Sequence, residues 1–176
     1  MPSHDLFDRL KAAHGDDWAA YTRHEFVRAL GAGSLAPAAF RHYLRQDYLF
    51  LIHFARAYGL AAFKADNLAD LRRAAGALSH IAENEMALHV GFCAGWGIDE
   101  AQMAATPEDP ANMAYTRYVL ERGLAGDALD LAVALAPCIV GYAEIGVWLT
   151  APGGPATGGN PYQTWIDTYA AQDYQD

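Results

Sequence analysis

The chain has 176 residues, of which 53% are hydrophobic and 19% are charged. This length supports one domain with a real core, and the composition argues against disorder. A net charge of −9 without any cluster of Lys or Arg makes nucleic acid and anionic membrane poor partners. The N-terminal residues contain no apolar run of signal-peptide length. We therefore expect a single domain over residues 1–176 that works in the cytoplasm.

Helical periodicity runs through the chain, and the alternation typical of β-strands is almost absent. Ser3 can cap a first helix, and Asn160 with Pro161 can cap and open the last one. Gly31 and Gly33 end the second helix, and Asp127 begins the sixth. The predicted helices span about 3–14, 16–30, 37–64, 67–95, 111–123, 127–149 and 162–169. Short connections between them predict an all-α bundle.

The most apolar window, residues 129–149, approaches the length of a membrane span. It carries Asp130, Pro137 and Glu144, which a lipid-facing helix rarely tolerates. A buried helix, bent by Pro137, fits this window better than a transmembrane one.

Asp47 stands where an amphipathic helix would place a leucine. Its helix has apolar side chains at alternating spacings of three and four, and Asp47 lies in that stripe between Leu44 and Leu51. A carboxylate facing a core is costly unless it is paired or hydrogen-bonded. The position predicts a polar pocket inside an apolar helical protein.

A second apolar stripe brings Cys138 and Tyr142 together. One helical turn separates them, so the thiol and the phenol lie side by side. The cysteine is either a small buried hydrophobe or a nucleophile with a lowered pKa. Cys93, the other cysteine, forms neither a CxxC motif nor a disulfide pattern with it. Four tyrosines also recur on the predicted helices: Tyr115, Tyr118, Tyr142, Tyr169. Together with Asp47 and Cys138 they suggest a site for a flat polar heterocycle.

Glu85 and His89 form a carboxylate–histidine pair one helical turn apart. Such a pair can bind a metal in a helical bundle. The alternative is a structural network in which Glu85 pairs with an arginine from another helix, and we favour it because a di-iron site needs more ligands.

Several segments of the sequence together resemble the TenA / thiaminase II family. They are FVRALGAGSLAPAAFRHYLRQDYLFLIHFARA, ENEMALH, AYT around Tyr115, LAPCIVGYAEIG around Cys138 and NPYQTWIDTY. The likeness runs from about residue 20 to the end, with the motifs in the order typical of the family. It implies a haem-oxygenase-like all-α fold that assembles as a homotetramer. The same likeness implies that the protein uses no haem, other cofactor or metal. It also implies hydrolysis of thiamin, or of aminomethyl-aminopyrimidine, to the hydroxymethyl-pyrimidine.

The resemblance also implies roles for individual residues. Cys138 takes the position of the nucleophile, and Tyr142 the place beside the thiol. Asp47 takes the position that hydrogen-bonds the amino group and ring nitrogen of the pyrimidine. The other substrate-binding positions are aromatic, and Tyr142 is among them: Phe50, Tyr115, Tyr142, Tyr169. The position of Phe50 is a tyrosine in some members of the family.

One departure from the family concerns its acid/base glutamate, which lies near the C-terminus on a helix beyond Asp176. No residue here matches it, so we expect C-terminal helices to be missing from this chain. This leaves two alternatives open. One is a catalytically weak pyrimidine- or thiamin-binding or regulatory protein, and the other a metal- or haem-using relative built on Glu85, His89 and Glu144.

Overall fold

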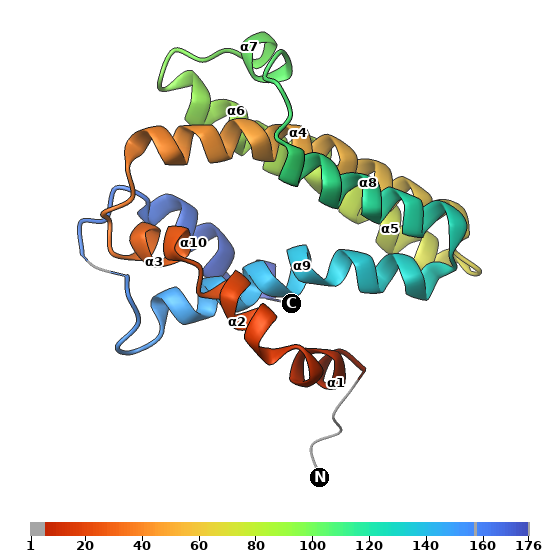
Figure 1. Cartoon of the computed structure of the whole chain (residues 1–176). Coiled ribbons are helices and arrows are strands. Elements are labelled where there is room, and N and C mark those ends of the chain that lie inside the picture. The colour runs from red at the N-terminus through yellow and green to blue at the C-terminus, as the bar shows by residue number, and fades with distance from the viewer. Residues whose placement is uncertain (1–5, 157, 176) are drawn as a thin grey trace. The chain divides into compact units, whose positions relative to one another are not determined.

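A computed structural model describes residues 6–156 and 158–175 of the chain. Within these ranges the secondary structure is helical and contains no strand (Figure 1). The all-α prediction is therefore confirmed, while the proposed cap Ser3 lies outside the described residues. Two compact units divide the chain. We call residues Ala36–Leu135 the central unit, and the chain up to Leu35 together with the chain from Ala136 onward the terminal unit.

The central unit is built around one long helix. Helix α4 (Pro37–Lys64) has Pro37 in its first turn, where proline needs no hydrogen-bond partner. Helices α5 (Leu68–His80) and α8 (Pro110–Ala125) pack along α4, as Figure 1 shows. The core between these helices is mainly aliphatic and includes the following buried side chains: Leu44, Leu51, Ala74, Ile81, Val119, Leu131.

The predicted helix 67–95 is present but changes its geometry in the middle. Helix α5 leads into a π-helical turn, Ile81–Glu85, which continues as α6 (Met86–Ala94). Such turns often occur at functional sites. A further helix, α7 (Glu100–Ala104), was not predicted, although Asp99 and Gln102 form a complete capping box at its start.

The terminal unit begins with three short helices. They are α1 (Leu6–Ala13), α2 (Gly15–Thr22) and α3 (Glu25–Gly31), so the single helix predicted over 16–30 is wrong. The chain breaks at His24, whose ψ of 151° is extended and whose Nδ1 accepts a hydrogen bond from Phe26 N at 3.1 Å. Histidine is an uncommon N-cap, which explains why the break left no clear signal in the sequence.

Helix α9 (Ala128–Thr150) crosses the boundary between the two units. Asp127 caps it as predicted, since Oδ1 of Asp127 accepts from the backbone N of Leu129 at 2.8 Å. Among the described helices it is the one whose length and hydropathy would suit a membrane span. Glu144, in its second half, binds Lys11 and Arg23. These ion pairs favour the core helix of a folded protein over a lipid-facing one.

Helices α10 (Gln163–Ala170) and α11 (Gln172–Gln175) complete the terminal unit. Asn160 joins α10 to the end of α3, because its Nδ2 donates to the carbonyls of Leu30 at 2.9 Å and Gly31 at 2.7 Å. Its Oδ1 accepts from Tyr162 N at 2.8 Å. The prediction that Asn160 caps this helix and Pro161 opens it is wrong, because Tyr162 is the N-cap of α10 and the helix begins at Gln163, one residue later than expected.

Candidate functional site

Asp47 is buried inside the central unit, with 8% of its surface exposed. Its Oδ2 lies 2.6 Å from Nε2 of His89 on α6 and accepts a hydrogen bond from the Tyr43 hydroxyl at 3.2 Å. His89 is only 1% exposed, and its Nδ1 lies 2.8 Å from the main-chain oxygen of Glu85. The predicted polar pocket on the apolar stripe thus exists, and its buried partner is a histidine.

The Glu85–His89 pair differs from both sequence interpretations. Glu85 contributes its main-chain oxygen to His89, and within the described residues its carboxylate forms no ion pair with an arginine, so that prediction is wrong. Burial raises the pKa of Glu85, and the charge of Asp47 raises it further against the smaller influence of His80 and His89. Glu85 therefore adds a second carboxyl group to the surroundings of Asp47.

His89 carries more positive charge than an ordinary buried histidine would. Burial by itself lowers its pKa, but the hydrogen bond and charge of Asp47, with the carbonyl and charge of Glu85, outweigh that effect and raise the pKa. The raised pKa favours the protonated imidazole, which forms an ion pair with the buried carboxylate of Asp47.

Phe50 and Tyr115 form an aromatic wall in the same unit. Their rings are nearly parallel, with centroids 6.1 Å apart and an interplanar angle of 13°. Phe54 also stacks on Phe50 at 5.2 Å, and the Tyr115 hydroxyl donates to the carbonyl of Ala134 at 3.0 Å. Along with His53, these rings line a small pocket. The two aromatic residues predicted for substrate binding in this unit thus lie together.

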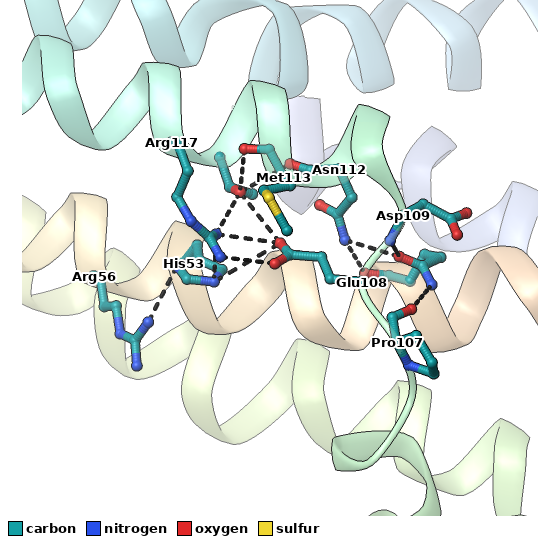
Figure 2. A network of polar contacts seen from close by, with 10 residues as sticks. His53, Arg56, Pro107, Glu108, Asp109, Asn112, Met113 and Arg117 are labelled. Atoms are coloured by element: carbon teal, nitrogen blue, oxygen red, sulfur yellow. Dashed lines mark hydrogen bonds and ion pairs between the residues drawn. The ribbon is translucent and has the colours of Figure 1, made fainter.

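A polar network fixes the start of α8, and with it Tyr115, against α4 (Figure 2). The Gln46 side chain donates to the carbonyl of Pro107 at 2.8 Å and accepts from Asp109 N at 2.9 Å. Arg117 binds Glu108 at 2.7 Å and the Nε2 of His53 at 2.8 Å. These contacts were not predicted, because each joins residues more than sixty positions apart or lies in a loop.

Cys138 lies in the terminal unit, in α9, and is 8% exposed. Tyr142 follows one turn later, and its ring lies 5.0 Å from that of Tyr169 on α10. Trp165 completes this aromatic cluster, at 4.5 Å from Tyr169 and 6.1 Å from Tyr142. The shared stripe of cysteine and tyrosine is confirmed, while the participation of Trp165 was missed.

The six predicted site residues fall into two groups of three. Asp47, Phe50 and Tyr115 belong to the central unit, and Cys138, Tyr142 and Tyr169 to the terminal unit. Sequence reasoning missed Tyr43 and the link from His89 to Asp47. Tyr43 precedes Asp47 by four residues, so helical spacing could have found it.

The residues of the metal hypothesis are engaged elsewhere. Both ring nitrogens of His89 face acceptors, and the carboxylate of Glu144 binds Lys11, Arg23 and the Trp18 indole. Across residues 6–156 and 158–175, no group of three or more His, Cys, Asp or Glu side chains is arranged to hold a metal ion. The geometry gives that hypothesis no support.

Comparison with known proteins agrees with the helical architecture. The family model described as "TENA/THI-4/PQQC family" matches residues 12–176. An aminopyrimidine aminohydrolase of Halalkalibacterium halodurans is 34% identical over 160 residues, which cover 90% of this chain and 70% of that protein. A Haemophilus influenzae protein of uncharacterised function is 44% identical over 158 residues, covering 90% and 73%. The crystal structure described as a TenA family transcription regulator from Silicibacter sp. TM1040 superposes with a TM-score of 0.91 at 48% identity, covering 97% and 74%.

Proposed function

Because the chain belongs to the TENA/THI-4/PQQC family and resembles an aminopyrimidine aminohydrolase along most of its length, we propose that it hydrolyses an aminopyrimidine of thiamin salvage with Cys138 as the nucleophile. The observation that carries the proposal is the buried Asp47 with one oxygen still available. Both of its hydrogen bonds, from His89 and Tyr43, end on Oδ2. Within the described part of the chain Oδ1 has no such partner.

Oδ1 of Asp47 is suited to anchor the pyrimidine. No side-chain nitrogen or oxygen among the described residues is both fully buried and unpaired, so Oδ1 is not completely enclosed. A carboxylate oxygen only accepts hydrogen bonds, which matches the exocyclic amino group of an aminopyrimidine. Phe50 and Tyr115 provide flat apolar surface for the ring, which restricts its orientation.

The proposed reaction has two halves that share one covalent intermediate. The Cys138 thiolate adds to a carbon of the pyrimidine ring, and the bond from the methylene carbon to the leaving nitrogen breaks with its electron pair. Water then adds to the methylene carbon, and the carbon–sulfur bond breaks to restore the aromatic ring and the thiolate. An amine leaving group gains one proton as it departs, and water later releases one proton when the alcohol forms, so the net change is hydrolysis. Tyr142, one turn from the thiol, supplies a hydroxyl that polarises the reacting groups.

Cysteine substitution tests this proposal, and the chain contains its own control. We expect Cys138→Ala to lose at least about a hundredfold in the rate of hydroxymethyl-pyrimidine formation from aminomethyl-aminopyrimidine or thiamin, measured by chromatography. Cys93, which is 0% exposed in the central unit, has a pKa raised by burial against the smaller opposing charge of Arg45. Cys93→Ala should therefore keep the turnover of its folded fraction. A Cys138→Ala protein that reacts as fast as the wild type would refute the nucleophile.

A second candidate is a pyrimidine- or thiamin-binding regulator on the same scaffold. It is favoured by the relative from Silicibacter sp. TM1040, which is described as a transcription regulator. Calorimetry that shows tight binding of the aminopyrimidine, with no product formed over hours, would support this candidate over the hydrolase.

We also propose the homotetramer that the family resemblance implies and the cytoplasmic location expected from the sequence. Large apolar side chains that are exposed in the isolated chain support self-association: Phe63 is 86% exposed and Leu124 is 68% exposed. Size-exclusion chromatography with light scattering would give the mass of the native protein, and the mass of a monomer would contradict the tetramer.

A further inference from the structure

His89 faces a hydrogen-bond acceptor on each of its ring nitrogens. Nε2 lies 2.6 Å from a carboxylate oxygen of Asp47, and Nδ1 lies 2.8 Å from the main-chain oxygen of Glu85. A neutral imidazole has a single N–H and can satisfy only one acceptor, whereas an imidazolium has two. With the side chain 1% exposed, water cannot replace the missing bond. The geometry therefore calls for the doubly protonated ring.

His53, in the same unit, has the opposite surroundings. Its Nε2 lies 2.8 Å from Arg117 and its Nδ1 lies 3.1 Å from Arg56, and a guanidinium can only donate (Figure 2). Burial lowers the pKa of His53, and the charges of Arg117 and Arg56 lower it further against the weaker effect of Glu108. One unit thus holds one histidine suited to be charged and one suited to be neutral.

We propose that His89 is a positioning residue, a buried imidazolium that holds Oδ2 of Asp47 and leaves Oδ1 to the amino group of the pyrimidine. This inference rests on the proposed function for its ligand, but its structural half stands on the contacts of His89 alone. Two donors on Oδ2 fix the rotation of the carboxylate about its terminal bond. The imidazolium also balances the buried negative charge.

The charged and titratable groups around His89 are consistent with this role. Asp47 faces it from α4 and Glu85 from the π-helical turn, while Tyr43 binds the same oxygen of Asp47 and His80 at the end of α5 acts on Glu85. The charges that act on His89 are those of Asp47 and Glu85, and both are negative, so the positive form of His89 is stabilised. An ordinary histidine would be mostly neutral at pH 7.5, about one unit above its usual pKa of roughly 6.5.

Nitrogen-15 NMR of the imidazole rings tests the structural half without any ligand. In the full-length protein at pH 7.5, we expect the His89 ring to show two protonated nitrogens and the His53 ring only one. The loss of single signals in His89→Gln and His53→Gln assigns them. A neutral His89 at this pH would overturn the inference, whatever the protein binds.

Calorimetry with the aminomethyl-aminopyrimidine tests the functional half. His89→Gln keeps an amide that can reach Asp47 but loses the charge, and we expect about tenfold weaker binding at pH 7.5, while His89→Leu, which keeps no donor, should lose about a hundredfold. Tyr43→Phe removes the longer, neutral hydrogen bond to the same oxygen and should have a smaller effect. In the wild type the affinity should fall as rising pH removes the second proton of His89, and this dependence should vanish in His89→Gln.

The possible outcomes separate this inference from the proposed function. If the wild type binds the pyrimidine and folded His89→Leu binds it equally well over the whole pH range, His89 is only structural and the inference fails while the proposed function stands. If the wild type does not bind the pyrimidine, the proposed function fails, and the NMR result still decides the state of His89. If His89→Leu does not fold, the pH dependence of the wild type and of His89→Gln gives the decision.

Discussion

Replacing Asp47 by asparagine should destabilise the protein, and the loss should grow toward acidic pH. The substitution keeps the size and one acceptor oxygen but removes the negative charge that faces His89 at 2.6 Å. Because both side chains are nearly inaccessible, the imidazolium would be left without its counter-charge. Asp47 therefore contributes to folding as well as to the proposed substrate site.

The magnitude follows from the two states of His89. Removal of one partner from a buried ion pair costs about 3–5 kcal/mol. In the wild type the pKa of His89 is raised, so its stabilising contribution is complete below the usual value of about 6.5 and is lost as pH rises through the higher folded value. Without Asp47, burial dominates and lowers the pKa of His89. Each pH unit below about 6.5 then lowers the free energy of unfolding of the variant by up to about 1.4 kcal/mol.

Urea unfolding followed by tryptophan fluorescence at pH 5.5, 6.5, 7.5 and 8.5 measures this difference. The chain offers a matched control in His42 and Asp109, which are also 2.6 Å apart but whose side chains are 58% and 47% exposed. Asp109→Asn should cost no more than about 1 kcal/mol, because water screens the exposed pair. If Asp47→Asn costs no more than Asp109→Asn at every pH, the buried ion pair does not stabilise the fold and the reasoning is wrong.

Two further predictions concern the terminal unit. Asn160→Ala removes three hydrogen bonds, two of them to the carbonyls that end α3, and should lower the free energy of unfolding in urea by about 3–4 kcal/mol. As a control, Asn67→Ala at an exposed helix cap should cost about 1 kcal/mol. Equal costs would contradict the role of Asn160 in joining α10 to α3. Burial raises the pKa of Glu144, but the hydrogen bonds of Lys11 and the Trp18 indole, with the charges of Lys11 and Arg23, outweigh it and lower the pKa. The contribution of Glu144 to stability is therefore present above about pH 4.5 and is lost as pH falls through the lower folded value. Glu144→Gln should therefore lower the protection of the backbone amides of α1 and α2 against hydrogen exchange at neutral pH, as acidic pH should in the wild type. Unchanged protection of these amides would refute the role of this ion pair.

The helices that could be predicted are those whose own residues mark them. Helix α4 has a long three-and-four stripe and a proline in its first turn, and α9 has Asp127 as its cap. The break at His24 was missed because an imidazole acts there as the N-cap. The π-helical turn was also missed, since its side chains do not differ in pattern from those of an ordinary α-helix.

The site was predictable up to the point where residues distant in sequence meet. Helical phase correctly placed Asp47 inside the core and Cys138 beside Tyr142. It could not show that His89, forty-two positions away, pairs with Asp47, because phase on one helix says nothing about which helix packs against it. The sequence did single out Glu85 with His89, but the contact between them uses a main-chain oxygen that every residue has.

The bonds of Asp47 indicate why a carboxylate, rather than an amide or an alcohol, occupies this position. A carboxylate offers two acceptor oxygens, and in a purely structural ion pair the fold would be expected to occupy both, since buried polar atoms are nearly always hydrogen-bonded. Here His89 and Tyr43 share one oxygen, and the other is not completely enclosed and has no partner among the described residues. An asparagine could still meet one donor, but it could not balance the imidazolium and accept from an amino group as well. The arrangement is therefore better explained by a ligand with a hydrogen-bond donor than by stability alone.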